Sequence, residues 1–363
     1  MAQSLRIALV APPLEPVPPP RYGGTERVVA TLATGLHARG HDVTLFAAGD
    51  SVVPCRLVPT VPHSLWSEGF AGDVGPYMEA TIAAVAARER EFDIVHSHID
   101  AHGFAYADRA GVPVITTPHL RLDRPAVAEM LGRFPNAPLV AISDNQRSLL
   151  PTANWLATIH HGMSFDAVRL GAGDGGYLAF VGRTATEKGI ADAIELARRS
   201  GLRLRIAAKA FERREVELHE TLVKPAEREG TVEFLGEVDP AARDELLGGA
   251  VASLMLGRWP EPFGLAALES LAVGTPVICR RAGALPEIIR HGRDGFIVDT
   301  IEDAERALGQ VAKLDRAAIQ RSARRRFSAE RMVAEYEQLY RQVIDGWSGR
   351  NEPRCTVMSA RTV

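Results

Sequence analysis

The sequence lacks the features that would place it in several simple classes. None of its apolar runs approaches the roughly 20 residues that a membrane-spanning helix needs. Its formal net charge is only −3, so the composition does not indicate binding to nucleic acid or to an anionic membrane surface. The opening stretch MAQSLRIALVAPP contains one arginine and an apolar run that proline soon ends. We therefore expect no signal peptide.

Cysteine is also scarce. The chain contains three cysteines, Cys55, Cys279 and Cys355, and an odd, scattered set is not a disulfide framework. This usage predicts a protein of the reducing cytoplasm. The 363 residues are 46% hydrophobic and 24% charged, which is ordinary for a globular protein, and the length predicts two domains.

Short apolar runs alternate with helical patterns in the first half of the chain. The runs are continuous rather than alternating, as in parallel strands covered on both faces, and they lie at 5–11, 42–48, 92–98, 112–119 and 137–143. The clearest helix is TERVVATLATGLHARG, where Thr25 can cap the start and Gly40 can end the helix. This pattern predicts a doubly wound α/β domain.

The same pattern then begins again. The glycine-rich stretch LGAGDGG at 170–176 is the best hinge candidate. New strands are predicted at 177–182, 202–208, 231–236, 251–256, 275–279 and 295–299. A basic helix is expected at 316–327, and a longer helix begins near Ser328. The sequence therefore predicts two similar α/β halves.

Two common nucleotide-binding signatures are absent, because the chain has neither G-x-G-x-x-G after its first strand nor G-x-x-x-x-G-K-[ST]. The first helix instead follows a glycine pair that includes Gly24, where a ligand could approach backbone N–H groups. In FVGRTATEKG, Arg183 and Lys188 follow a strand and precede a helix, an arrangement that suits a diphosphate. Taken alone, each feature also fits an ordinary turn or solvated surface cations.

The stretch EPFGLAALE holds two glutamates, Glu261 and Glu269, that lie 269 − 261 = 8 residues apart. Gly264 allows close approach, and the N–H groups of Phe263, Gly264 and Leu265 can point at an anion where the helix starts. Glu269, inside that helix, could accept ribose hydroxyls, and Glu261 would lie nearer the group attached to the phosphate. The spacing therefore suits a nucleotide sugar.

Together these motifs resemble the retaining glycosyltransferases of the GT-B fold that carry an E-x7-E motif, the family 4-like, group 1 glycosyltransferases. The resemblance covers roughly residues 5–345 and rests on several stretches in order, YGGTERVVATLATGLHARGHDVTLF, FDIVHSH, ITTPHL, VAISD, GRTATEKG, EPFGLAALE and GTPVICRRAGALPEIIRHGRDGFIVD. IHHGMSFDAV resembles the linker of the group, with His161 in place of its usual asparagine.

The resemblance implies two Rossmann-like domains that face a central cleft. The first, at 1–168, would bind the acceptor, and the second, at 169–335, would bind the nucleotide sugar. A helix at 336–349 would cross back to the first domain, and 350–363 would be a disordered tail. The implied activity is a hexosyltransferase-type reaction that moves a sugar from a nucleoside diphosphate sugar, a UDP-sugar foremost, to a hydroxyl acceptor with retention of configuration.

The resemblance also implies the roles of individual residues. Arg183 and Lys188 would hold the diphosphate without a metal or other cofactor, Glu261 the sugar and Glu269 the ribose. His119 would contact the sugar, with His98 as the second candidate. Membrane contact would be peripheral and would arise only with a lipid acceptor.

Three alternatives remain open. His96, His98 and His102 could form a metal site, although the sequence offers no third ligand with normal zinc spacing. The protein could be a sugar-nucleotide 2-epimerase of the same fold, which would release no acceptor-linked product. It could also be a non-catalytic sugar-binding or nucleotide-binding protein, which detectable donor turnover would exclude.

Overall fold

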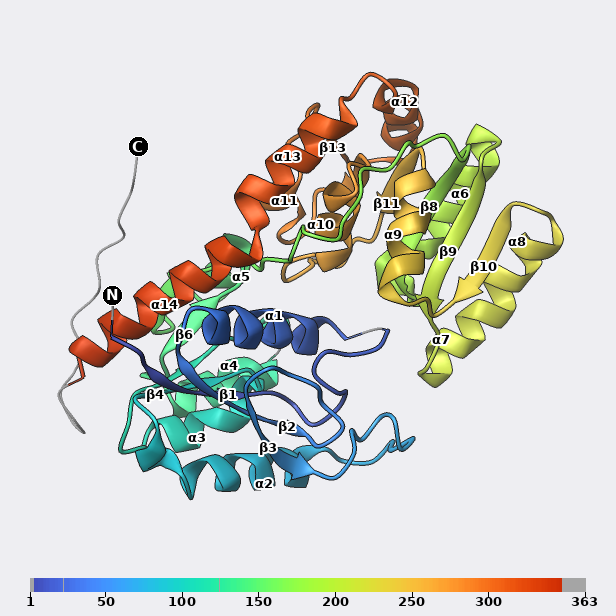
Figure 1. Ribbon diagram of the computed structural model, residues 1–363. Helices are drawn as coiled ribbons and strands as arrows, with labels where there is room; N and C mark the ends of the chain where they lie inside the picture. The colour runs from blue at the N-terminus through green and yellow to red at the C-terminus, as the bar shows by residue number, and fades with distance from the viewer. Residues whose placement is uncertain (1–2, 22, 124, 348–363) are drawn as a thin grey trace. The chain divides into compact units, whose positions relative to one another are not determined.

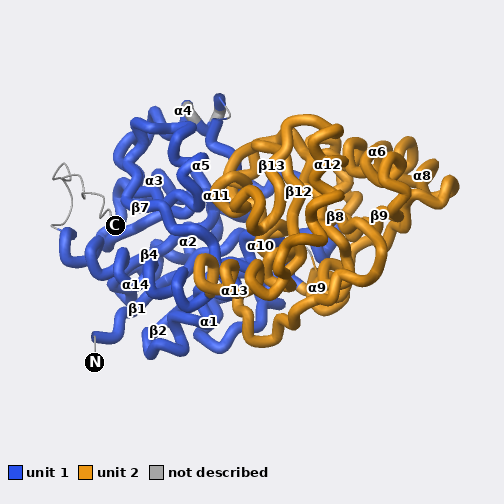
Figure 2. The backbone as a smooth tube through the Cα atoms, turned by 90° about the horizontal axis from the view of Figure 1, so that it is seen from above, with its two compact units in different colours: residues 1–19, 23–163, 329–363 blue, residues 20–22, 164–328 orange. Residues whose placement is uncertain are grey.

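The computed structural model describes residues 3–21, 23–123 and 125–347. The chain divides into two compact units, shown in separate colours in Figure 2. Unit 1 comprises 1–19, 23–163 and 329–363, and unit 2 comprises 20–22 and 164–328. The first segment of unit 1 thus ends at 163, where the sequence analysis expected 168. The chain returns to unit 1 at 329, where the sequence analysis expected the second domain to continue to 335. The tail predicted at 350–363 lies outside the described residues.

Unit 1 is built on a seven-stranded sheet in the order β3-β2-β1-β4-β5-β6-β7, and all neighbouring strands are parallel. The strands are β1 (Arg6–Val10), β2 (Asp42–Ala48), β3 (Arg56–Val61), β4 (Ile94–Ser97), β5 (Val114–Thr116), β6 (Leu139–Ala141) and β7 (Trp155–Thr158). The sequence predicted all of these except β3 and β7. Both are edge strands whose residues are largely half-buried or exposed, so neither has the continuous apolar run of a central strand.

The helices of unit 1 cover both faces of its sheet. They are α1 (Gly24–Ala38), α2 (Gly75–Ala86), α3 (Phe104–Ala107), α4 (Pro125–Arg133), α5 (Asp144–Ser148) and α14 (Ala329–Asp345), with short 3-10 turns η1 (Glu89–Glu91) and η2 (Asp100–Gly103). Helix α14 packs beside α1 (Figure 1), and a Cβ atom on Gly35 of α1 would lie 2.4 Å from Val333 of α14. The whole of α14 belongs to unit 1, because its buried residues, including Tyr336 and Tyr340, pack there.

The start of α1 differs from the prediction. The helix begins at Gly24 with Gly23 as its N-cap and no side-chain cap, so the proposed capping role of Thr25 is wrong. Thr25 lies within the first turn, because the chain becomes helical at Gly24, the second residue of the glycine pair. The predicted end is confirmed, since Gly40 follows the helix with φ +86° and donates its N–H to the carbonyl of His37.

Unit 2 holds a six-stranded parallel sheet in the order β10-β9-β8-β11-β12-β13. The strands are β8 (Tyr177–Arg183), β9 (Arg203–Lys209), β10 (Val232–Gly236), β11 (Ala252–Met255), β12 (Val277–Arg280) and β13 (Gly295–Val298). All six lie where the sequence predicted strands. The intervening helical segments are η3 (Thr186–Lys188), α6 (Ile190–Ser200), α7 (Arg213–Leu218), η4 (His219–Val223), α8 (Lys224–Arg228), α9 (Pro240–Gly249), α10 (Leu265–Ala272), α11 (Leu285–Ile288), α12 (Ile301–Val311) and α13 (Arg316–Phe327).

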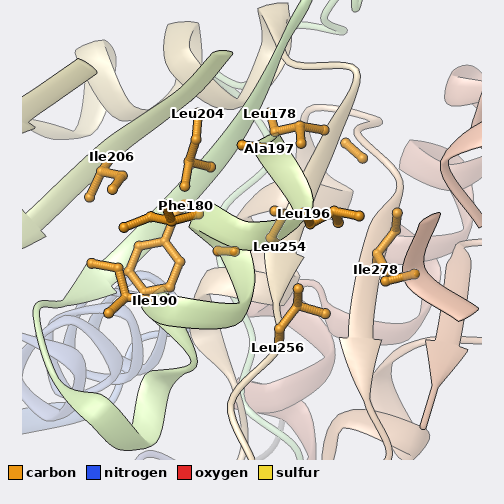
Figure 3. Packing of buried hydrophobic residues seen from close by; sticks show 14 of the residues in the cluster. Leu178, Phe180, Ile190, Leu196, Ala197, Leu204, Ile206, Leu254, Leu256 and Ile278 are labelled. Atoms are coloured by element: carbon orange, nitrogen blue, oxygen red, sulfur yellow. The ribbon is translucent and has the colours of Figure 1, made fainter. Parts of the chain in front are cut away.

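Successive side chains of β8 reach the two faces of this sheet in turn. Leu178 and Phe180 join the larger core with α6 and α12, whereas Ala179 packs with α9 on the opposite face. Figure 3 shows Phe180, Ile190 and their neighbours in the larger core. Burial on both faces explains why the strands are continuously apolar. Within the described part of the chain, no helix has both the length and the apolar character required to cross a bilayer.

Candidate active site

Arg183 is the last residue of β8 and faces three carboxylates. Its guanidinium lies 3.3 Å from Glu187, 3.3 Å from Glu212 and 2.9 Å from Glu215. Glu215 is buried in the first turn of α7, and its Oε2 accepts the N–H of Phe211 at 2.9 Å and that of Glu212 at 3.1 Å. Glu215 therefore caps α7 with one carboxylate oxygen and pairs with the Arg183 guanidinium through the other. The sequence analysis missed Glu215, although a glutamate at the third position of a helix is a recognisable capping signal.

Lys188 ends the short turn η3, which packs tightly against the loop after β11. A Cβ atom on Gly189 would lie 2.3 Å from the backbone nitrogen of Gly257, and one on Gly257 would lie 2.3 Å from the carbonyl oxygen of Glu187. Only glycine at both positions permits this approach. The contact brings the Lys188 Nζ to 2.5 Å from the Glu261 Oε1, so two residues 73 positions apart form an ion pair.

Helix α10 begins directly after Gly264, which has φ +105° and no side-chain cap. Phe263 is buried and makes an edge-on contact with Phe327 at 6.0 Å between ring centroids. Leu265 is the first helical residue, so Glu261 lies outside the helix and Glu269 lies inside it. This confirms the geometry on which the separate roles of the two glutamates were predicted.

Glu269 is buried, and its Oε1 accepts a hydrogen bond of 2.7 Å from Arg243 on α9. Arg243 is buried as well, and its other nitrogens bind Asp244 at 2.7 and 3.0 Å. The carboxylate of Glu269 is thus held in one orientation by a neighbouring helix. The sequence analysis did not identify Arg243, because a single arginine on a helix carries no local signal of a partner 26 residues away.

The predicted residues of unit 2 therefore gather at one edge of its sheet. Arg183 ends β8 and Lys188 follows it, and Glu261 and Gly264 follow β11, its neighbour in the sheet. The carboxyl edge of a parallel sheet is the usual ligand-binding edge of this architecture. Two cations, the N-terminus of α10 and the oriented carboxylate of Glu269 can bind an anionic ligand that carries hydroxyl groups.

In unit 1, His119 follows β5 and is partly accessible. Its Nε2 lies 2.9 Å from the Nδ1 of buried His98, and its ring stacks on His161 at 5.1 Å. Burial lowers the pKa of His119 to about 3 and holds the pKa values of His98 and His161 well below their usual range. These imidazoles are therefore neutral at neutral pH.

Asp100 fixes the backbone beside this ring. Its Oδ1 accepts the N–H of His119 at 2.9 Å, and its own backbone has φ +47°, which is uncommon for a residue other than glycine. Burial raises the pKa of Asp100 to about 6. Gly24, the other predicted residue of unit 1, is the first residue of α1.

His96 lies beside His98, with 4.0 Å between the ring centroids, but makes its own hydrogen bonds. Its Nδ1 lies 2.7 Å from the Tyr340 hydroxyl and its Nε2 lies 2.7 Å from the Thr117 hydroxyl, which in turn lies 3.0 Å from that of Tyr336. Both ring nitrogens are thus engaged by hydroxyl groups. Residues 3–21, 23–123 and 125–347 contain no group of three or more His, Cys, Asp or Glu side chains that could hold a metal ion, so the suggested metal site with His98 and His102 receives no support.

The comparisons with known proteins agree with these two units. Residues 22–161 match the family model described as Glycosyltransferase Family 4, and residues 166–330 match that described as Glycosyl transferases group 1. The chain is 26% identical over 373 residues to D-inositol 3-phosphate glycosyltransferase of Mycolicibacterium smegmatis, covering 88% of this chain and 86% of that protein.

Two solved structures illustrate the similarity in fold. AviGT4, a glycosyltransferase involved in avilamycin A biosynthesis, is 26% identical with a TM-score of 0.70, and the match covers 94% of this chain and 99% of that one. Anabaena Alr3699/HepE in complex with UDP and glucose is 18% identical with a TM-score of 0.70, over 92% and 98% of the two chains. The fold is GT-B, with two Rossmann-like domains.

The chain has two α/β units, each built on a sheet of parallel strands, and unit 2 carries cations and oriented carboxylates at the carboxyl edge of its sheet. This is the class of GT-B glycosyltransferases. The two family models together account for most of the chain, with a family 4 domain followed by a group 1 domain. The chain belongs to the group 1, family 4-type glycosyltransferases.

Proposed function

We propose that this glycosyltransferase moves a sugar from a nucleoside diphosphate sugar to a hydroxyl acceptor and retains the anomeric configuration. The observation that carries the proposal is the convergence of Arg183, Lys188 and the N-terminus of α10 at one sheet edge, because these groups can neutralise a diphosphate. Unit 2 would bind the donor and unit 1 the acceptor.

The two glutamates would hold the two sugars of the donor. Glu269, fixed by Arg243, would accept hydroxyls of the ribose, and Glu261 would accept hydroxyls of the transferred sugar. His119 is the residue of unit 1 that we propose to contact the transferred sugar. UDP is the favoured nucleotide, supported by the fold relative Alr3699/HepE, whose structure contains UDP and glucose.

The proposed reaction breaks the bond between the anomeric carbon and the diphosphate and forms a bond from that carbon to the acceptor oxygen on the same face. The acceptor proton passes to the departing diphosphate, so no enzyme carboxylate acts as a covalent nucleophile. Arg183, Lys188 and the first N–H groups of α10 would stabilise the negative charge that develops on the leaving group. These groups would make a divalent metal unnecessary.

The donor can be identified by thermal shift against a panel of nucleoside diphosphate sugars, because a bound donor stabilises the folded protein by mass action. The favoured donor is then incubated with and without candidate hydroxyl acceptors, and the products are analysed by NMR for linkage and anomeric configuration. We expect an acceptor-linked product of retained configuration, formed also in excess chelator. An epimerised nucleotide sugar formed without acceptor, or binding without turnover, would overturn the proposal.

The cysteines of the chain bear on its cellular location. We propose a cytoplasmic location, because the sequence has few, scattered cysteines, and Cys55 and Cys279 are free thiols. Peripheral contact with a membrane is proposed only for a lipid acceptor.

A further inference from the structure

The ring-to-ring contact between His98 and His119 determines where the protons of both imidazoles lie. The His98 Nδ1 and the His119 Nε2 are 2.9 Å apart, a hydrogen-bond distance that requires one proton between the two nitrogens. Burial keeps both rings neutral at neutral pH, so each ring carries one proton. Only two arrangements satisfy these conditions.

In the first arrangement, the His98 Nδ1–H donates to the His119 Nε2. The second nitrogen of His98 is then a lone pair, and His119 carries its proton on Nδ1. In the second arrangement, the His119 Nε2–H donates to His98, which must then carry its own proton on Nε2. The accessible ring nitrogen of His119 would in that case be an acceptor.

The surroundings of His98 favour the first arrangement. His98 is 1% exposed, and its Nε2 is buried with no hydrogen-bond partner among the residues that the structure describes. The second arrangement would bury an unpaired N–H donor at this atom, whereas the first buries only an unpaired acceptor. Unpaired buried N–H groups are the rarer of the two in folded proteins.

The ring of His119 is also prevented from turning away. One face stacks on His161 with 18° between the ring planes, and the backbone N–H is held by Asp100. With Nε2 bound to His98, the nitrogen left for a ligand is Nδ1, for which we find no partner in the described part of the chain, and the residue is partly accessible.

We propose that His98 is a positioning residue that holds His119 as the Nδ1–H tautomer, so that His119 presents an N–H donor to an oxygen atom of the ligand. Under the proposed function, on which this role rests, that oxygen belongs to the transferred sugar. The site therefore selects a hydroxyl or carbonyl oxygen at this position. It disfavours a ligand whose only group there is an N–H donor.

The tautomer can be measured without any assay of activity. The full chain is labelled with ¹⁵N-histidine, and two-bond ¹H–¹⁵N correlations at neutral pH distinguish protonated from unprotonated ring nitrogens. The signals of His119 are assigned by their loss in His119→Gln. We expect a protonated Nδ1 and an unprotonated Nε2 in the wild-type protein. The opposite pattern would overturn the inference.

A matched pair of variants tests the role of His98. His98→Leu removes the donor to His119, whereas His96→Leu removes an equally buried imidazole from the same segment that does not hydrogen-bond to His119. We expect His119 to become a mixture of tautomers in His98→Leu and to keep the Nδ1–H form in His96→Leu. Equal spectra of His119 in both variants would contradict the assignment, and the wild-type spectrum decides alone if His98→Leu does not fold.

Steady-state kinetics of His98→Leu test whether the tautomer of His119 affects the reaction. Loss of one oriented hydrogen bond should lower kcat roughly tenfold in His98→Leu, with donor KM changed less than kcat. An unchanged kcat would overturn the positioning role. If the wild-type tautomer is as expected but no donor sugar is turned over, the proposed function fails and the proton arrangement stands.

Discussion

The neutral imidazoles of unit 1 should make the protein sensitive to mild acid. A histidine whose pKa is lowered by folding stabilises the folded state above its unfolded pKa of about 6.5, and that stability is lost as the pH falls toward the folded value. For His119, with a folded pKa of about 3, the loss between pH 7 and pH 5 amounts to about 2 kcal/mol. His96, His98 and His161 act in the same direction, because burial lowers their pKa values too.

Asp100 opposes this effect. Folding raises its pKa from 3.8 to about 6, so the folded state gains protons before the unfolded state does as the pH falls. The contribution of Asp100 to the free energy of unfolding rises by about 1.3 kcal/mol as the pH falls from 7 to 5. This is smaller than the loss at His119 alone, so the four histidines determine the sign, and the free energy of unfolding should decrease on acidification.

The measurement is urea unfolding of the full chain at pH 7 and pH 5, followed by a probe in unit 1 because two domains need not unfold together. In His119→Gln the decrease in stability between the two pH values should shrink by about 2 kcal/mol, and in Asp100→Asn it should grow by about 1.3 kcal/mol. His37→Gln is the control, because His37 is exposed on α1. The same pH dependence in His119→Gln and in the wild type would refute the reasoning.

Two further predictions concern the proposed donor site. Lys188→Ala should lower turnover about 100-fold or more, on the scale of losing one donor to a developing anion, and near-normal turnover in a correctly folded variant would remove Lys188 from the site. Glu269→Ala should mainly raise donor KM, because the ribose is unchanged in the reaction, whereas Glu261→Ala should mainly lower kcat. Steady-state kinetics with varied donor check both, and identical profiles for the two glutamate variants would contradict their separate roles.

Most of the fold could be predicted from the sequence because central parallel strands are buried on both faces. Strands such as β1 and β8 are therefore continuous apolar runs between helical patterns. The edge strands β3 and β7 were missed for the same reason, since their residues are only partly covered. The N-cap of α1 was placed two residues late, because the glycine pair, rather than Thr25, sets the backbone there.

The candidate site could likewise be predicted only in part. Gly264 and the two glutamates could be proposed as site residues because their spacing along one loop and helix has a local meaning. Contacts between side chains from different elements were not predicted. Arg243 reaches Glu269 from α9, and His98 meets His119 across two neighbouring strands. Such pairings depend on how sequence-distant elements pack, and no short pattern in the chain records them.

The ion pairs of Arg183 differ in how easily a diphosphate could replace them. The carboxylates of Glu187 and Glu212 are 36% and 66% exposed, so water can solvate them when a phosphate replaces them, whereas Glu215 is 4% exposed and anchored by two backbone N–H groups. Breaking an exposed ion pair costs little free energy, about 0–1 kcal/mol. Glu215 would then stay bound and keep the guanidinium directed at the ligand.

This difference between the carboxylates predicts opposite effects on donor KM for substitutions at Glu212 and Glu215. Glu212→Gln removes an exposed competitor of the diphosphate, so donor KM should stay unchanged or fall up to about threefold. Glu215→Gln keeps an amide oxygen that can cap α7 but loses the buried charge that lies 2.9 Å from the Arg183 guanidinium, so donor KM should rise about tenfold, which corresponds to about 1.4 kcal/mol of lost ion pairing. Steady-state kinetics with varied donor, together with circular dichroism to verify folding, separate the two. Equal KM values for both variants would mean that Arg183 is oriented by the ligand itself rather than by Glu215.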